Sequence, residues 1–140
     1  MCPPEDDRST LAAESVFRFA CRNTLPCFTQ CCRDVNIYLT PYDVLRMRKA
    51  LGMGSEEFLA RHTRHFLAAR TSIPVVQLAM DPETLTCRFV TEEGCSIYAD
   101  RPWACRMFPL DITPVEGEYR TIAGKERCLG LLENATRTVR

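Results

Sequence analysis

Residues 27–32 have the sequence Cys27-Phe-Thr-Gln-Cys31-Cys32, the densest group of cysteines in the chain. If this turn is helical, Cys27 and Cys31 lie on one face and can meet one metal ion, because residues four apart in a helix are neighbours. Cys31 and Cys32 are adjacent, so their side chains diverge. They suit two ions, or two irons of one cluster, better than a single tetrahedral centre. The flanking segment 21–34 has no sustained hydrophobic period and is expected to be an irregular loop.

The remaining cysteines extend this group toward both ends of the chain, which has 140 residues and nine cysteines. An odd number excludes complete internal disulfide pairing. Cys2 lies in a polar leader, and without it eight thiols remain, enough for two tetrahedral sites or one polynuclear site with bridging sulfurs. The expected ligands are Cys21, Cys27, Cys31, Cys32, Cys87, Cys95, Cys105 and Cys128.

Thiolates are soft donors, which suit zinc, copper(I) and iron–sulfur centres, whereas magnesium and calcium prefer oxygen. The cysteine spacing matches neither a C-x2-C…C-x2-C zinc ribbon nor the C-x2-C-x2-C-x3-C run of bacterial ferredoxins. The alternative is that these cysteines are small buried hydrophobic side chains. The number and grouping of the thiols favour a metal-binding module.

Composition limits the partners and the compartment. Eighteen acidic and eighteen basic residues cancel, which argues against a nucleic-acid partner. No apolar stretch approaches the roughly 20 residues needed to cross a bilayer, so no membrane partner is expected. Residues 1–10 are acidic and polar and do not resemble a signal peptide. The sequence therefore predicts a cytoplasmic protein, in a compartment where spaced thiols bind metal more often than they form disulfides.

The hydrophobic pattern predicts an α+β fold: a small single domain over residues 11–140, with helices, short β-hairpins and cysteine-rich loops held by metal, after a flexible leader over residues 1–10. The best helix signal starts at Thr40, followed by Pro41 and by Asp43 in a capping-box arrangement. Helices are expected over 11–20, 41–51, 56–67 (with Ser55 as its N-cap) and 129–138, and strands over 75–80, 86–90, 110–115 and 119–123, with a turn at 92–94 before Cys95.

A resemblance follows from the stretch Cys95-x-Ile97-Tyr98-x-x-Arg101-Pro102-x-x-Cys105-Arg106-x-Phe108-Pro109, together with the first cysteine group and Cys87-x-Phe89. Over residues 19–128 the chain resembles the YkgJ-type cysteine-cluster family, whose domain is thought to chelate zinc or iron and is related to flagellin lysine methylases. The resemblance implies the same eight cysteines as ligands and a bacterial source. It departs in the first run, where the family has C-x2-C-x2-C-C and this chain has gaps of five and three residues.

Several other side chains have two interpretations. Arg101 and Arg106 could hydrogen-bond the sulfurs, stabilise thiolate charge or meet an anion, or could pair with Asp100, Asp111 or the 92–93 turn. Tyr98 and Trp103 are expected to pack over the cluster and exclude water. His62 and His65, three residues apart on an expected helix, are interpreted as partly exposed histidines rather than metal ligands.

Two functions remain open at this stage. The first is a module with a structural or metal-handling role, in which thiolates hold zinc or an iron–sulfur cluster. The second is an iron–sulfur redox protein or a component of a lysine methyl-transfer system. The sequence has no recognisable S-adenosylmethionine site and no evident acid–base pair, so no independent catalytic activity is expected.

Overall fold

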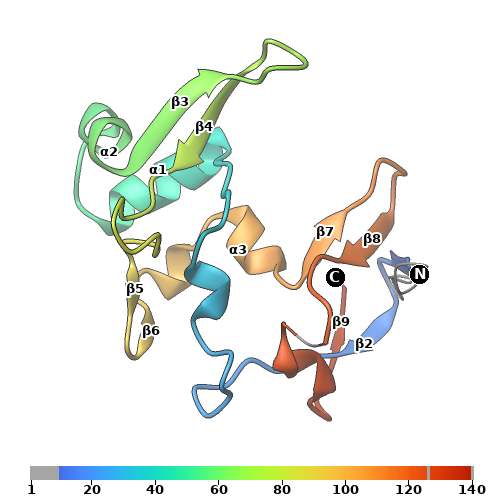
Figure 1. The fold of residues 1–140 in the computed structure, drawn as a ribbon. Helices are drawn as coiled ribbons and strands as arrows, with labels where there is room; N and C mark the ends of the chain where they lie inside the picture. Colours follow the sequence, from blue (N-terminus) through green and yellow to red (C-terminus); the bar gives the residue numbers. More distant parts are fainter. Residues whose placement is uncertain (1–9, 126, 140) are drawn as a thin grey trace, which may run out of the picture. The chain divides into compact units, whose positions relative to one another are not determined.

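The computed structural model describes residues 10–125 and 127–139, so the expected leader lies outside the described residues except for Thr10. The chain forms two compact units (Figure 1). Unit 1 combines the N-terminal part, up to Phe28, with the C-terminal part, from Met107. Unit 2 is the continuous segment Thr29–Arg106. The two units are considered separately below.

The first helix of unit 2 begins as its sequence predicts. The N-cap Thr40 accepts a hydrogen bond at Oγ1 from the Asp43 N–H (3.1 Å), and the Thr40 N–H donates to Asp43 Oδ2 (2.8 Å). Both halves of the capping box are therefore formed. Helix α1 spans Pro41–Ala50, and Gly52 follows it at a φ of 65°. Helix α2 (Ser55–His62) has Gly54 at the N-cap, so Ser55 is its first helical residue rather than the cap.

The second helix is shorter than predicted. Residues 63–67 form strand β3 (Thr63–Leu67), which pairs in antiparallel register with β4 (Pro74–Leu78). The predicted strand near residues 75–80 is confirmed, but its partner precedes it in the chain instead of following it. The prediction of a continuous strand over 86–90 is wrong, since that stretch forms only isolated bridges and the start of β5 (Val90–Thr91). β5 pairs with β6 (Gly94–Cys95) across the predicted turn.

The hydrophobic core of unit 2 joins its helices to its hairpins. Met47 of α1 and Phe58 of α2 are fully buried, at 0% exposure, and Leu78 of β4 packs with them. Cys87 and Cys95 pack against the same core. The core therefore fixes the positions of two of the expected ligands. The remaining elements of unit 2 are the 3₁₀-helices η1 (Gln30–Cys32) and η2 (Tyr98–Asp100) and the helix α3 (Trp103–Met107), whose last residue already belongs to unit 1.

Unit 1 consists mainly of short strands, and the helix predicted over residues 11–20 is wrong. That stretch forms β1 (Leu11–Ala12) and β2 (Val16–Arg18), which pair with strands from the other end of the chain. The predicted hairpin over 110–123 is confirmed as β7 (Leu110–Ile112) and β8 (Glu118–Thr121). The tail forms a 3₁₀-helix, η3 (Leu129–Leu132), and strand β9 (Thr136–Thr138) in place of the predicted helix.

The mixture of helices and short strands confirms the α+β class. That residues 11–140 act as one metal-binding domain stays a prediction. Within the described residues, no helix is both long and apolar enough to cross a membrane.

Gly130 lies where the two ends of the chain meet in unit 1. The Ala20 N–H donates to the Gly130 carbonyl (3.0 Å), and a Cβ at residue 130 would lie 2.7 Å from the Ala20 carbonyl oxygen. Because that neighbour is backbone, it cannot move aside cheaply. We expect Gly130→Ala to destabilise unit 1 by about 1–3 kcal/mol, measured as a lower urea midpoint. Gly54→Ala, with open space around its Cβ, is the matched control, and an equal loss in both variants would contradict the interpretation.

Candidate metal centre

Five of the eight candidate cysteines belong to unit 2 and come from four separate stretches of its sequence. Cys31 and Cys32 lie in η1, Cys87 precedes β5, Cys95 lies in β6 and Cys105 lies in α3. The Cys87 N–H donates to the Cys32 carbonyl at 2.7 Å, which joins the first stretch to the second. All five thiols are free of disulfides.

The thiols are close enough to influence one another electrostatically. Burial, and then the neighbouring Cys87, Cys95 and Cys31, raise the pKa of Cys105 to about 12, against a small opposing effect from Arg101. Burial likewise raises the pKa of Cys87, to which Cys95 and Cys31 also contribute. Negative charge on Cys87 or on Cys105 is therefore disfavoured by the neighbouring sulfurs.

The two adjacent thiols in η1, Cys31 and Cys32, have pKa values shifted in opposite directions. A hydrogen bond from the Cys32 thiol lowers the pKa of Cys31 to about 7, with smaller help from a backbone hydrogen bond and from Arg101, although burial opposes the change. The same hydrogen bond, with burial, raises the pKa of Cys32 far above its ordinary value. Of these two thiols, Cys31 ionises first, and the Cys32 thiol stabilises its thiolate by donating a hydrogen bond.

This asymmetry predicts an alkylation order in the metal-free protein. Iodoacetamide should modify Cys31 with a half-maximal rate near pH 7, because only the thiolate reacts. Cys105 should react only under strongly alkaline conditions, because its pKa is about 12. Peptide mass spectrometry across a pH series measures both. Equal modification of the two cysteines at neutral pH would contradict the assignment.

The donor set fits a thiophilic metal in its chemistry, since it offers several soft sulfurs. The site is not assembled in this structure: among residues 10–125 and 127–139, no three Cys, His, Asp or Glu side chains lie in a geometry that could hold a metal ion. The thiols are neighbours rather than a finished ligand sphere. The helical placement expected for Cys27 and Cys31 is also not formed, because Thr29 between them has a φ of 67° and η1 begins only at Gln30.

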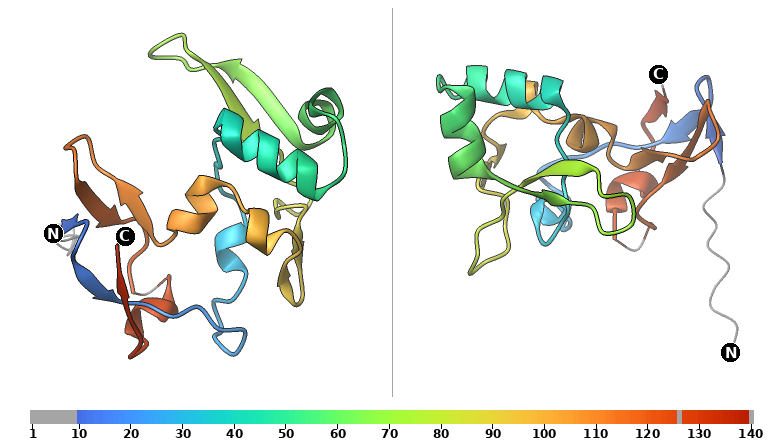
Figure 2. Two further views of the ribbon diagram at one scale, coloured as in Figure 1. Left: turned by 180° about the vertical axis from the view of Figure 1, so that it is seen from behind. Right: turned by 90° about the horizontal axis from the view of Figure 1, so that it is seen from above.

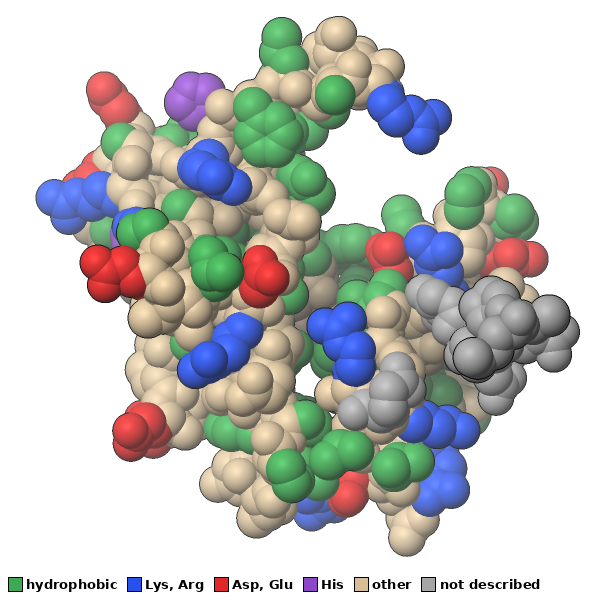
Figure 3. Space-filling view, in the orientation of Figure 1, with side chains coloured by type: hydrophobic (Ala, Val, Ile, Leu, Met, Phe, Trp, Pro, Cys, Tyr) green, Lys and Arg blue, Asp and Glu red, His purple; other side chains and the backbone are tan. Residues whose placement is uncertain are grey.

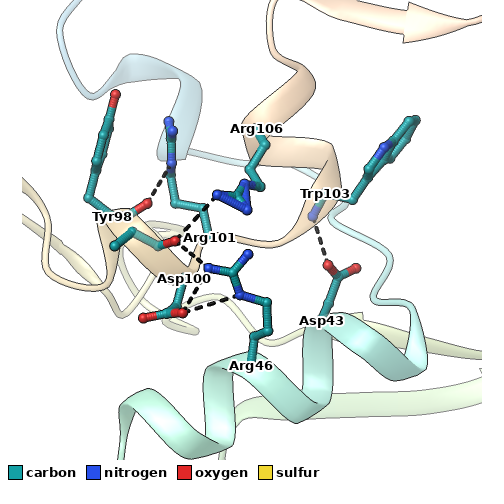
Figure 4. A network of polar contacts seen from close by, with 8 residues as sticks. Asp43, Arg46, Tyr98, Asp100, Arg101, Trp103 and Arg106 are labelled. Carbon is teal, nitrogen blue, oxygen red and sulfur yellow. Dashed lines mark hydrogen bonds and ion pairs between the residues drawn. The ribbon is translucent and has the colours of Figure 1, made fainter. Parts of the chain in front are cut away.

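A polar network fixes the segment that carries Cys105 to helix α1 (Figure 4). Asp43, only 4% exposed, accepts a hydrogen bond at Oδ1 from the Trp103 N–H (2.9 Å), while its other oxygen closes the capping box of α1. One carboxylate therefore caps α1 and also satisfies the first N–H of α3. One turn further along α1, Arg46 bonds Asp100 Oδ1 (2.9 Å) and the Ala99 carbonyl (2.7 Å).

Arg101 points away from these acids. Its Nε–H donates to the Tyr98 carbonyl (2.8 Å), and its guanidinium lies 3.6 Å from the centroid of the Tyr98 ring. Because Arg101 lowers the pKa of both Cys31 and Cys105, it is a positive charge near the thiols. Asp100, a proposed partner of Arg101 in the ion-pair alternative, pairs with Arg46 instead. Arg106 donates a long hydrogen bond, 3.4 Å, to the Ala99 carbonyl.

Two expectations about the surroundings of the cluster are wrong. Tyr98 and Trp103 are 63% and 41% exposed, so they do not form a dry cover over the thiols. His62 ends α2 and His65 lies in β3, so the two histidines do not share a helix. His62 packs between the rings of Phe58 and Phe89, and burial lowers its pKa. That neither histidine is a ligand stays a prediction.

Unit 1 brings together the other three candidates. Cys128 is buried, and its pKa is raised by burial and then by the neighbouring Cys27 and Cys21, against hydrogen bonds from the backbone of η3. Pairing of β2 with β9, at opposite ends of the chain, brings these thiols near one another. Unit 1 therefore has a three-thiol set, Cys21, Cys27 and Cys128, and unit 2 has a five-thiol set, Cys31, Cys32, Cys87, Cys95 and Cys105.

A family model named CxxCxxCC, described as a "putative zinc- or iron-chelating domain", matches residues 20–134. The chain belongs to the CxxCxxCC family. The match contains all eight candidate cysteines and confirms the resemblance seen in the sequence. No curated protein and no solved structure matches the chain.

Within this CxxCxxCC chain, the structure adds residues that the sequence did not mark as functional. The capping role of Asp43 is visible in the sequence, but its second contact with Trp103, 60 residues away, is not. The pairing of Arg46 with Asp100 spans 54 residues and also has no local signal. Both contacts end on residues within the C-x-I-Y-x-x-R-P-x-x-C motif. The motif therefore depends on α1 for its placement.

Proposed function

We propose that this protein binds zinc or iron through its cysteine thiolates, in a structural or metal-handling role. One observation carries the proposal: five cysteines from four separated stretches converge in unit 2, two of them packed against its core. Membership of a family described as metal-chelating supports it. The three-thiol set of unit 1 is proposed as a second group of ligands.

The electrostatics of the five-thiol set give a physical reason for binding. Burial and the neighbouring thiols raise the pKa of Cys87 and of Cys105, so these two cysteines keep their protons at neutral pH without a bound cation. A bound divalent cation supplies positive charge that stabilises the thiolates and cross-links the segments that carry them. Loading therefore releases protons, and affinity should rise with pH. Cys31, whose pKa is about 7, is the first sulfur available to an incoming ion.

Two groups of residues around the thiols have supporting roles in this proposal. Arg101, held by the Tyr98 carbonyl and ring, offsets part of the negative charge of a thiolate set. Asp43 and Arg46 hold the segment from Ala99 to Trp103 and so position Cys105. None of these side chains acts as a ligand in the proposal.

The test is to purify the protein without oxygen, record its ultraviolet–visible spectrum and measure bound metals by mass spectrometry. Colourless protein with stoichiometric zinc supports the zinc form, and brown protein with sulfur-to-iron absorption and stoichiometric iron supports the iron form. Cys2→Ser should keep the metal content of the wild type. Protein without metal that keeps its fold after alanine replacement of Cys31, Cys87 and Cys105 would refute the proposal.

A further inference from the structure

Strand β3 has an open edge. Among the residues that the structure describes, this sheet contains only β3 and β4, and the far side of β4 is occupied by residues 37–39. There the Leu39 N–H donates to the Val76 carbonyl and the Leu78 N–H donates to the Ile37 carbonyl, each at 2.8 Å. The outer side of β3 is thus the edge of this small sheet, and its backbone can accept another strand.

The hydrogen-bond register shows which residues face that edge. The Ala79 N–H donates to the His62 carbonyl, and the Ala68 N–H donates to the Ile73 carbonyl. In an antiparallel ladder the bonded pairs alternate with non-bonded pairs, so Arg64 and Phe66 bond β4 across the ladder. His65 and Leu67 therefore direct their N–H and C=O groups outward, where an added strand would find them.

The edge is also exposed, apolar and basic. Phe66, Leu67 and Ile73 are 43%, 63% and 57% exposed. From Phe58 to Met80 the sequence contains three arginines and two histidines and no acidic residue. Figures 1 and 2 show the hairpin extending beyond α1 and α2, and the hairpin surface in Figure 3 carries hydrophobic and basic side chains. Two copies of such an edge repel each other, whereas an acidic strand is attracted.

A cavity of about 410 Å³ adjoins the base of the hairpin, and three arginines, Arg61, Arg64 and Arg88, line it. Gln77, only 4% exposed, fixes one of them: its Oε1 accepts from the Arg64 guanidinium at 2.8 Å. Arg64 and Gln77 face each other in the ladder, so they lie on the same face of the sheet. A strand added beside β3 would place its alternate side chains on that face, next to Arg64.

The acidic residues around this cavity do not cancel the arginines. Asp34 and Asp81 also line it, and hydrogen bonds from the N–H groups of Glu83 and Thr84 favour the charged form of Asp81, so two aspartates stand against three arginines. Arg61 pairs with Glu57 at 3.0 Å, with both side chains largely exposed, and such pairs are weak. Positive charge therefore exceeds negative charge around the cavity.

We propose that the open edge of β3, with the arginine-lined cavity beside it, binds an extended acidic segment of a partner protein. The segment adds as a strand through the outward backbone groups of His65 and Leu67. Its acidic side chains face Arg64 and the cavity on one face of the sheet, and its apolar side chains, on the other face, contact Leu67. Strand addition of this kind obtains affinity from main-chain hydrogen bonds and specificity from alternate side chains.

The experiment measures fluorescence anisotropy with the full chain, purified without oxygen and with whatever metal it carries. The probe is a labelled ten-residue peptide in which glutamate alternates with valine, and the control peptide has glutamine in place of glutamate. We expect saturable binding of the acidic peptide, at least about tenfold tighter than that of the neutral one, and weakened by salt.

Two pairs of variants separate edge pairing from charge. Leu67→Pro removes an outward N–H and should abolish binding, whereas Leu67→Ala keeps that N–H and should retain it. Arg64→Glu should weaken binding by about tenfold or more, whereas Lys49→Glu on α1, the same change of charge, should not. Circular dichroism checks that each variant is folded.

Three outcomes would overturn the proposal. They are no saturable binding of the acidic peptide, equal binding of both peptides, and binding that survives Leu67→Pro. Binding to vesicles of phosphatidylglycerol and phosphatidylcholine, without peptide binding, would assign the hairpin to a lipid surface and would also refute it. Metal content does not enter any of these measurements, so the metal-binding proposal stands or fails separately.

Discussion

Replacing Cys105 by serine is expected to release metal from unit 2 and to destabilise the protein strongly. Cys105 belongs to the five-thiol set and is placed by α3. A ligand that binds only the folded state at a concentration about 1,000 times its Kd stabilises that state by about 4 kcal/mol. Loss of that contribution should lower the midpoint of thermal unfolding by roughly 10 °C or more for a chain of this size.

The measurement combines metal analysis with thermal unfolding in the presence and absence of a chelator. Wild-type protein should lose stability on chelation, and Cys105→Ser should start near that lower value and respond little. Cys128→Ser is the matched variant in unit 1, and we expect it to leave the metal of the five-thiol set in place. A Cys105→Ser protein with wild-type metal content and unfolding midpoint would remove Cys105 from the ligand set.

Asp43→Ala is expected to have the second largest effect. The buried carboxylate accepts hydrogen bonds from the Thr40 N–H and the Trp103 N–H, at 2.8 and 2.9 Å. Its removal leaves both donors without this acceptor and opens the capping box, at a cost of about 2–4 kcal/mol. Because α3 begins at Trp103, the same change should loosen the placement of Cys105 and speed metal release to a chelator.

Thr40→Ala separates capping from positioning. It removes only the hydroxyl that accepts from the Asp43 N–H, so it should cost about 1 kcal/mol and leave the contact with Trp103 intact. The rate of metal transfer to a coloured chelator is the deciding readout. If Asp43→Ala and Thr40→Ala transfer metal to the chelator at equal rates at neutral pH, Asp43 stabilises α1 without positioning Cys105.

Sequence patterns located the elements whose determinants are local. Helix α1 is predicted at its N-terminus because Thr40, Pro41 and Asp43 act within one turn. The hairpin of β7 and β8 is predicted because its turn and both strands lie within 14 residues. The prediction of a helix over residues 11–20 is wrong because this segment pairs as strands with residues 118–119 and 136–138. These partners are more than 100 positions away in the sequence. Pairing at that distance leaves no periodicity in the segment itself.

The candidate site shows the same division. The cysteines and the family motif are visible in the sequence, since the residue types carry the chemistry. The three-and-five division of the thiols depends on which segments fold together, and the sequence does not show it.

The end of α2 at His62 depends on pairing of Thr63–Leu67 with Pro74–Leu78. This pairing makes an exposed strand of residues whose sequence pattern predicts an amphipathic helix. The basic edge proposed as a docking surface follows from that one difference.

The path of the chain through the two units sets an order of events during synthesis. Unit 2 is one continuous segment, whereas unit 1 needs residues from both ends of the chain. A ribosome that adds about 5–20 residues per second completes the five-thiol set before Cys128 exists. Cys21 and Cys27 are made before the five-thiol set, but Cys128, the third member of their own set, is made after it. Metal supplied during translation would therefore meet the sulfurs of unit 2 first, and the three-thiol set could only close as the last part of the chain is made.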